Sequence, residues 1–262
     1  MAGILSHFDL AALDPLGAER AHLEAEAAKL AYDARNRFIA DPASTTRLGH
    51  MLAPETAEKL AALIDPDRAM DDPAALSEAV HKETIYITVV DRDRMAVSLI
   101  YSIFHSFGSG LASDKFGINF QNRGAGFSLA EGHPNEAAGG KRPMHTIIPA
   151  MLKKDGKVVM PFGVMGGPYQ PAGHARVLTN IVDYGMHPQQ ALDAPRSFPD
   201  AGQLMVERGY AETVRAELAA KGHSVGTPES ALGGAQAILI DEESGVLQGA
   251  SDPRKDGCAL GY

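Results

Sequence analysis

ETIYITVVDRDRMAVSLIYSIFHSFGSG, residues 83–110, carries the strongest indication of the fold. It contains two runs, residues 84–91 and 95–104, that are rich in β-branched and aromatic residues at both alternating sets of positions. The runs flank the turn Asp91-Arg92-Asp93-Arg94, so they predict a β-hairpin that is buried on both faces. Such a hairpin needs covering layers.

Upstream of the hairpin the sequence is typical of helices. Residues 14–41 carry apolar side chains at helical spacing, with Asp14 as a possible cap, Pro15 in the first turn and Asp41-Pro42 as the end. Shorter helices are predicted over residues 54–65 and 71–80. The first 80 or so residues are therefore expected to be helical.

Downstream, strands and helices are both predicted. Strand candidates are residues 116–121, 145–152, 157–165, 234–241 and 246–250, and KKDG at 153–156 joins two of them as a second hairpin. Helix candidates are residues 172–186, which end near Gly185, and 211–222, which end at Gly222. This order favours an α+β fold in which sheets lie between helices.

Composition excludes several functions. The net charge of -9 disfavours nucleic acid and acidic membrane surfaces as partners, which leaves a small molecule. The single cysteine, Cys258, cannot form an internal disulfide, and the N-terminus lacks a secretion signal, so we expect a cytoplasmic protein. No segment has the length of a transmembrane helix.

Cofactor motifs are missing as well. There is no P-loop, no H-E-x-x-H and no cysteine cluster, and the ten histidines show no recognised ligand pattern, so neither a cofactor nor a metal is predicted. Four glycine clusters follow predicted strands, at residues 108–110, 124–126, 139–140 and 166–167. Glycines at such places let the backbone approach a ligand closely, and the alternative is that they only form turns.

Several motifs, in order and at matching spacing, resemble the γ-glutamyltransferase family. Residues 8–42 resemble the end of its large subunit, and residues 84–262 resemble its small subunit. The motifs that carry the second resemblance are the run at 83–110, GINFQNRGAGFS (117–128), GKRPMHTIIPAM (140–151), GVMGGPYQPAGHARVL (163–178), VDYGMHPQQALDAPR (182–196) and GASDPRKDGCALGY (249–262). The resemblance implies an N-terminal-nucleophile αββα sandwich, partial in this chain. The regions would be a helical segment, 1–83, and a catalytic β-sandwich region, 84–262.

The resemblance also implies that the protein is a precursor that cleaves itself between Glu83 and Thr84. The Thr84 hydroxyl would attack the carbonyl of Glu83, and hydrolysis of the resulting ester would free an N-terminal threonine. Its α-amine, with a pKa of about 8, suits a general base for its own hydroxyl. The alternative is an ordinary β-branched residue that begins a strand.

Other site residues follow from the same motifs. Ser102 corresponds to a hydroxyl residue that bonds the nucleophile, although a buried serine can instead satisfy a backbone carbonyl. Gly166 and Gly167 correspond to the pair whose N–H groups form the oxyanion hole. His145 and Thr146 correspond to two serines that contact the substrate carboxylate.

The family's ammonium-binding pocket is altered in this chain. Phe104, Arg123 and Gly126 stand where the transpeptidases have Asn, Gln and Asp. Because arginine repels an ammonium and binds carboxylates, the change favours a compact acidic amide over a γ-glutamyl compound. Glutathione-hydrolase-like, oxamate-amidohydrolase-like and cephalosporin-acylase-like activities fit this description. Arg123 paired with a structural acid is the alternative.

Family precursors are roughly twice this length, so we expect a partner for the hairpin: a large-subunit or N-terminal half, or a second copy in a homo-oligomer. Three hypotheses remain: an autoprocessing amide hydrolase or acyltransferase, a non-catalytic fragment that needs the missing half, and metal-dependent hydrolysis through the histidines.

Overall fold

The computed structural model describes residues 1–71 and 82–262. The helix predicted over residues 71–80 lies outside this range apart from Asp71. The helices predicted over residues 14–41 and 54–65 are confirmed as α2 (Ala18–Phe38) and α4 (Pro54–Ala61). Two short helices, α1 (Ala2–Leu5) and α3 (Leu48–Met51), and a 3₁₀ turn, η1 (Leu10–Ala12), accompany them.

Helix α2 is shorter than the predicted 14–41. The Asp14 carboxylate accepts the N–H of Leu16 at 2.9 Å and closes a turn, so it does not cap the helix, which begins after Gly17. The helix is buried over most of its length. Its polar residues are buried as ion pairs, because Glu24 bonds both Arg20 and Arg176 at 2.9 Å.

The strands form three sheets. The hairpin consists of β1 (Lys82–Val90) and β2 (Ala96–His105). A four-stranded antiparallel sheet has the order β3 (Ala150–Lys154), β4 (Lys157–Met165), β8 (Gly234–Ile240) and β9 (Leu247–Ser251). A small third sheet, β5 (Ser197–Asp200), β6 (Gln203–Val206) and β7 (Val225–Gly226), was not predicted.

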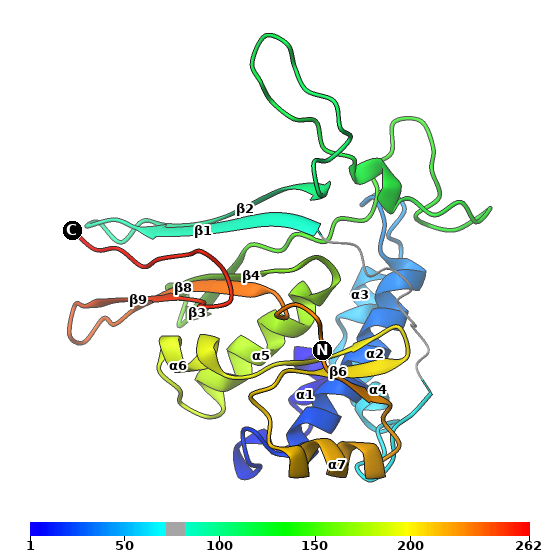
Figure 1. Cartoon of the computed structure of the whole chain (residues 1–262), viewed down its shortest axis with the longest axis vertical. Helices are drawn as coiled ribbons and strands as arrows, with labels where there is room; N and C mark the ends of the chain where they lie inside the picture. Colours follow the sequence, from blue (N-terminus) through cyan, green and yellow to red (C-terminus); the bar gives the residue numbers. More distant parts are fainter. Residues whose placement is uncertain (72–81) are drawn as a thin grey trace.

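The hairpin lies on one face of the four-stranded sheet, and α5 (Gln170–Val182) and α6 (Pro188–Asp193) cover the other face (Figure 1). The helix α7 (Glu212–Ala220) lies beside α2. The order helix, sheet, sheet is three layers of an αββα sandwich, which confirms the predicted fold class. Between the two sheets, the ring of Tyr86 packs directly against Gly163, where a Cβ would lie only 2.4 Å from Cε2 of the ring.

The hairpin is buried on one face only within this chain. Tyr86 and Ile100 on the inner face are 3% and 7% exposed. The alternating residues of the outer face, Ile85, Ile87, Val89, Val97, Leu99 and Tyr101, are 41–51% exposed. The prediction of two buried faces is therefore wrong for the chain by itself, because nothing in the described residues covers the outer face.

In the long connection from β2 to β3, one strand prediction is wrong, and the strand predicted over residues 145–152 begins later than predicted. Residues 116–121 form no strand, and a single bridge joins Ala112 to Asn119. Residues 145–149 are irregular, and β3 begins only at Ala150. Alternating apolar residues here lack a neighbouring strand, so their pattern has no ladder to join.

Of the helices in the described ranges, none combines the length and the apolar character that crossing a lipid bilayer requires.

Candidate active site

Thr84 lies near the start of β1, directly opposite Ser102 of β2. Its Oγ1 donates to Ser102 Oγ at 3.2 Å. The pairing is irregular at this point, since Glu83 pairs with Phe104 and Ile103 is left over as a bulge. A bulge turns a strand and re-aims its side chains, and bulges are common beside active sites. The irregularity coincides with the predicted cleavage point.

Phe104 adopts a strained backbone conformation just after the bulge. Its φ of 76° is in the left-handed region, which bulky side chains rarely enter. Its N–H donates to Ser102 Oγ at 3.0 Å, and its ring is buried. Ser102 Oγ thus accepts from both Thr84 and Phe104, which fixes the hydroxyl of Thr84 relative to the bulge.

Asn122 holds the end of β2 in this shape. Its N–H donates to the carbonyl of Ile103, and its side-chain oxygen accepts the N–H of His105 at 3.0 Å. Its amide nitrogen also lies 2.9 Å from His105 Nδ1. Asn122 could not be identified from the sequence, because no spacing rule connects an asparagine in a loop with a strand that ends 17 residues earlier.

Gly166 and Gly167 form the turn from β4 into the 3₁₀ turn η3 (Gly167–Tyr169) and α5. Their φ values of 123° and 58° favour glycine, and a Cβ on Gly166 would lie 2.8 Å from Gly233 Cα. Strand β1 contacts η3, so the fold brings the glycine pair to the sheet layer that carries Thr84. The Tyr32 hydroxyl of α2 donates to the carbonyl of Pro168 and anchors this turn.

Arg123 lies in a 3₁₀ turn, η2 (Arg123–Gly126), and is 5% exposed. Its guanidinium carbon lies 4.2 Å from the centroid of the Phe104 ring, and its Nη1 donates to Thr146 Oγ1 at 2.9 Å. Burial lowers the pKa of Arg123 to about 10. The predicted alternative, an ion pair with a structural acid, is not found among the residues whose side chains are described.

His145 is exposed at the edge of this group. Partial burial, and secondarily the charge of Arg123, lower its pKa, which favours the neutral imidazole. Gly126 contributes its carbonyl, which accepts from Asn135 Nδ2 at 2.7 Å. The structure therefore brings together Thr84, Ser102, Phe104, Arg123 and Thr146, while the turn that follows Gly166 contacts β1, the strand that carries Thr84.

One cluster has side chains that metals bind. His22 and Glu26, one turn apart on α2, lie with His223 so that one ligand atom of each is within 4.8 Å of the others. His22 Nδ1 is 2.8 Å from His223 Nε2, while Glu26 accepts the Lys29 ammonium at 2.8 Å. The bonds among these groups and the adjacent ammonium describe a buried polar network, and we assign it no metal. The sequence analysis overlooked the His22–Glu26 spacing.

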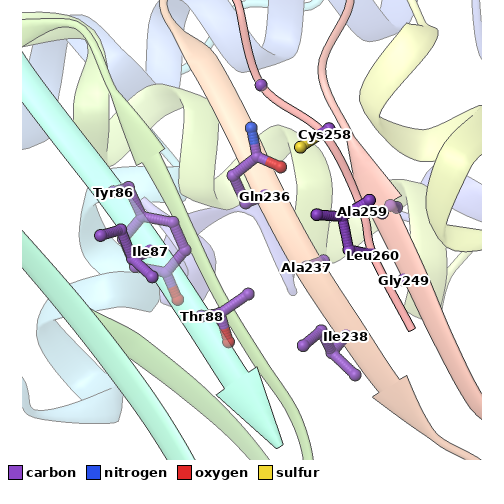
Figure 2. Close-up of a pocket in the computed structure, with 12 residues that line it drawn as sticks. Tyr86, Ile87, Thr88, Gln236, Ala237, Ile238, Gly249, Cys258, Ala259 and Leu260 are labelled. Atoms are coloured by element: carbon purple, nitrogen blue, oxygen red, sulfur yellow. The ribbon is translucent and has the colours of Figure 1, made fainter. Parts of the chain in front are cut away.

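A cavity of about 210 Å³ lies between β1 and the C-terminal segment over β8 (Figure 2). Tyr86, Thr88, Gln236 and Cys258 line it. None of the predicted site residues does, so this cavity is separate from the group around Thr84.

Comparison with known proteins links this geometry to one family. The model of the family described as gamma-glutamyltranspeptidase matches residues 1–262. A glutathione hydrolase-like YwrD proenzyme of Bacillus subtilis is 36% identical over 272 residues, covering 98% of this chain and 50% of that protein. An oxamate amidohydrolase proenzyme of Klebsiella pneumoniae is 35% identical over 270 residues, covering 99% and 50%.

The fold has solved relatives as well. The crystal structure of a cephalosporin acylase from Bacillus halodurans superimposes with a TM-score of 0.86 at 33% identity, over 100% of this chain and 50% of that chain. The present chain thus spans about half the length of the curated relatives it matches.

Proposed function

Because this chain belongs to the gamma-glutamyltranspeptidase family, we propose that it is an autoprocessing N-terminal-threonine amidohydrolase or acyltransferase. It acts through an acyl-enzyme on γ-glutamyl compounds or related small acidic amides. The observation that carries the proposal is the hydroxyl of Thr84, bonded to Ser102 at the bulge that follows Glu83 in the hairpin.

The first step is cleavage of the chain itself. Thr84 Oγ1 attacks the carbonyl carbon of Glu83, the bond from that carbon to the Thr84 nitrogen breaks, and the hydroxyl proton ends on the released amine. Water then hydrolyses the ester, which leaves a carboxylate on Glu83 and restores the threonine hydroxyl. The bulge and the strained backbone of Phe104 place this peptide bond in irregular structure, which supports its reactivity.

The freed threonine carries out the second reaction. Its α-amine takes the proton of Oγ1 as that oxygen attacks an amide, and it returns the proton to the leaving amine. The N–H groups of Gly166 and Gly167 are suited to stabilise the developing oxyanion, because glycine lets two amides approach one oxygen. Water or an amine then accepts the acyl group.

A partner completes the molecule in this proposal. The exposed outer face of the hairpin is apolar, and the chain matches about half of relatives that are named proenzymes. An N-terminal half that covers this face would form the fourth layer of the sandwich, with a second copy of the chain as the alternative.

The activity is tested with a substrate panel. Purified protein is incubated with γ-glutamyl amides, oxamate and β-lactam side-chain amides, in the wild type and in Thr84→Ala, and amine release is followed. Release that disappears in Thr84→Ala supports the proposal, and the preferred amide separates oxamate-amidohydrolase-like from cephalosporin-acylase-like activity. No release with the N-terminal half supplied supports the alternative, a non-catalytic subunit. Release that persists in Thr84→Ala and disappears with a chelator would favour metal-dependent hydrolysis.

A further inference from the structure

Arg123 is a buried cation that has no anionic partner among the described side chains. It is 5% exposed, and none of the carboxylates whose side chains are described lies within ion-pair distance. Its Nη2 also lacks a hydrogen-bond partner within the described part of the chain. Buried arginines in proteins are normally paired, since an unpaired buried charge is costly. The described part of the chain therefore holds Arg123 ready for an anion that comes from elsewhere.

The other contacts of Arg123 are neutral and hold the guanidinium in place. The ring of Phe104 stacks against it at 4.2 Å, and Thr146 Oγ1 accepts from Nη1 at 2.9 Å. Neither contact neutralises the charge. With a pKa of about 10, the guanidinium is protonated at neutral pH, and the neighbouring imidazole of His145 is kept neutral. A ligand that binds here therefore meets a single positive charge.

Arg123 is connected to Thr84 through consecutive contacts. Thr84 bonds Ser102, and Ser102 bonds the N–H of Phe104, whose ring lies against the guanidinium. Each link is a direct contact, so the cation belongs to the same site as the nucleophile. A substrate whose acyl part carries an anion would use both groups of this site.

We propose that Arg123, with Thr146, binds a carboxylate on the acyl side of the substrate, and that the preferred substrates are monoamides of dicarboxylic acids that lack an α-ammonium group. This inference rests on the proposed function. A guanidinium binds a carboxylate by two parallel hydrogen bonds, whereas it repels an ammonium at the same place. The γ-glutamyl group carries both charges and is disfavoured accordingly.

Glutarate and glutamate test the proposal, because they differ only in the α-ammonium. Binding of each to the purified protein is measured by titration calorimetry, which does not require turnover. We expect glutarate to bind at least about 10-fold more tightly than glutamate, equal to about 1.4 kcal/mol. A series from oxalate to glutarate then identifies the spacing between the two carboxylates.

Variants assign the effect to Arg123. We expect Arg123→Gln to weaken glutarate binding at least about 10-fold, because a charge-assisted bond is lost, and Arg123→Lys to weaken it less. Arg142→Gln is the matched control, since Arg142 is also basic but its side chain is 79% exposed and pairs with Asp41 on the surface. It removes the same charge and is expected to leave binding unchanged.

Three results overturn the proposal: no glutarate binding, glutamate bound as tightly as glutarate, or an equal effect of Arg123→Gln and Arg142→Gln. The wild-type comparison of the two ligands decides the matter even where Arg123→Gln does not fold. Mass spectrometry of the same sample reports cleavage at Thr84, so failure of this inference is distinguished from failure of the proposed function.

Discussion

Replacing Gly163 by alanine tests how the two sheets hold Thr84. A Cβ at Gly163 would lie 2.4 Å from the ring of Tyr86, whereas ordinary contacts begin at 3.4 Å, so β1 and β4 must separate by about 1 Å. Overpacking of this kind costs about 1–3 kcal/mol, or about 2–12 °C in Tm for a chain of this size. A displacement of about 1 Å at a catalytic group can slow a reaction by about 100-fold.

The assay compares melting temperature and the rate of cleavage at Thr84 in Gly163→Ala, in Tyr86→Leu, in the double variant Gly163→Ala/Tyr86→Leu and in Gly139→Ala. Gly139 has no atom within 4 Å of its added Cβ, so its variant serves as the control. The smaller side chain at Tyr86 is expected to relieve the clash, so that the two changes together cost less than their sum. Wild-type melting and cleavage in Gly163→Ala would refute the close contact between the sheets.

Three further predictions concern groups that support the site. Tyr32→Phe leaves the partly buried carbonyl of Pro168 without its donor and is expected to cost about 1–3 kcal/mol and to slow cleavage, as measured by denaturation and mass spectrometry. Asp252→Asn leaves Arg196, which it bonds at 2.5 Å, charged and buried, with an expected loss of about 3–5 kcal/mol in denaturant unfolding. Burial, with the charges of nearby basic groups, lowers the pKa of His223 to about 3. Because the unfolded chain protonates first, stability is expected to be full above about pH 6.5 and to fall as pH drops toward 3, and His223→Gln should flatten this dependence in melting curves.

Exposed positions supply the comparisons for these predictions. Tyr101→Phe removes a hydroxyl from a side chain that is 51% exposed and should change stability by less than about 0.5 kcal/mol. Glu242→Gln breaks a surface pair with Lys157, worth about 0–1 kcal/mol. Equal effects at the buried and exposed positions, or a pH dependence that His223→Gln leaves unchanged, would contradict these assignments.

The sequence was most informative where the pattern is local. Two β-rich runs around one turn predicted the hairpin, and the same turn places Ser102 opposite Thr84. Residues 157–165 and 234–241 were predicted from their own composition and form β4 and β8. The glycine pair at 166–167 was predicted to end a strand, and its positive φ values show why glycine is used there.

Contacts between distant segments could not be predicted in this way. Tyr32 reaches Pro168 and Asn122 holds the end of β2, but neither relation leaves a periodic signal. Residues 116–121 alternate like a strand, yet Phe116 and Ile118 are 67% and 58% exposed, because no neighbouring strand pairs with them in the described chain. The family motifs point to Arg123, and only the structure shows that it is buried with no carboxylate beside it among the described side chains.

In the proposed function, Thr84 becomes the N-terminus of an active chain. Intact-protein mass spectrometry after expression with the N-terminal half tests it directly. We expect a species that begins at Thr84 in the wild type and only the uncleaved chain in Thr84→Ala. A wild-type chain that stays intact between Glu83 and Thr84 under these conditions would contradict the account.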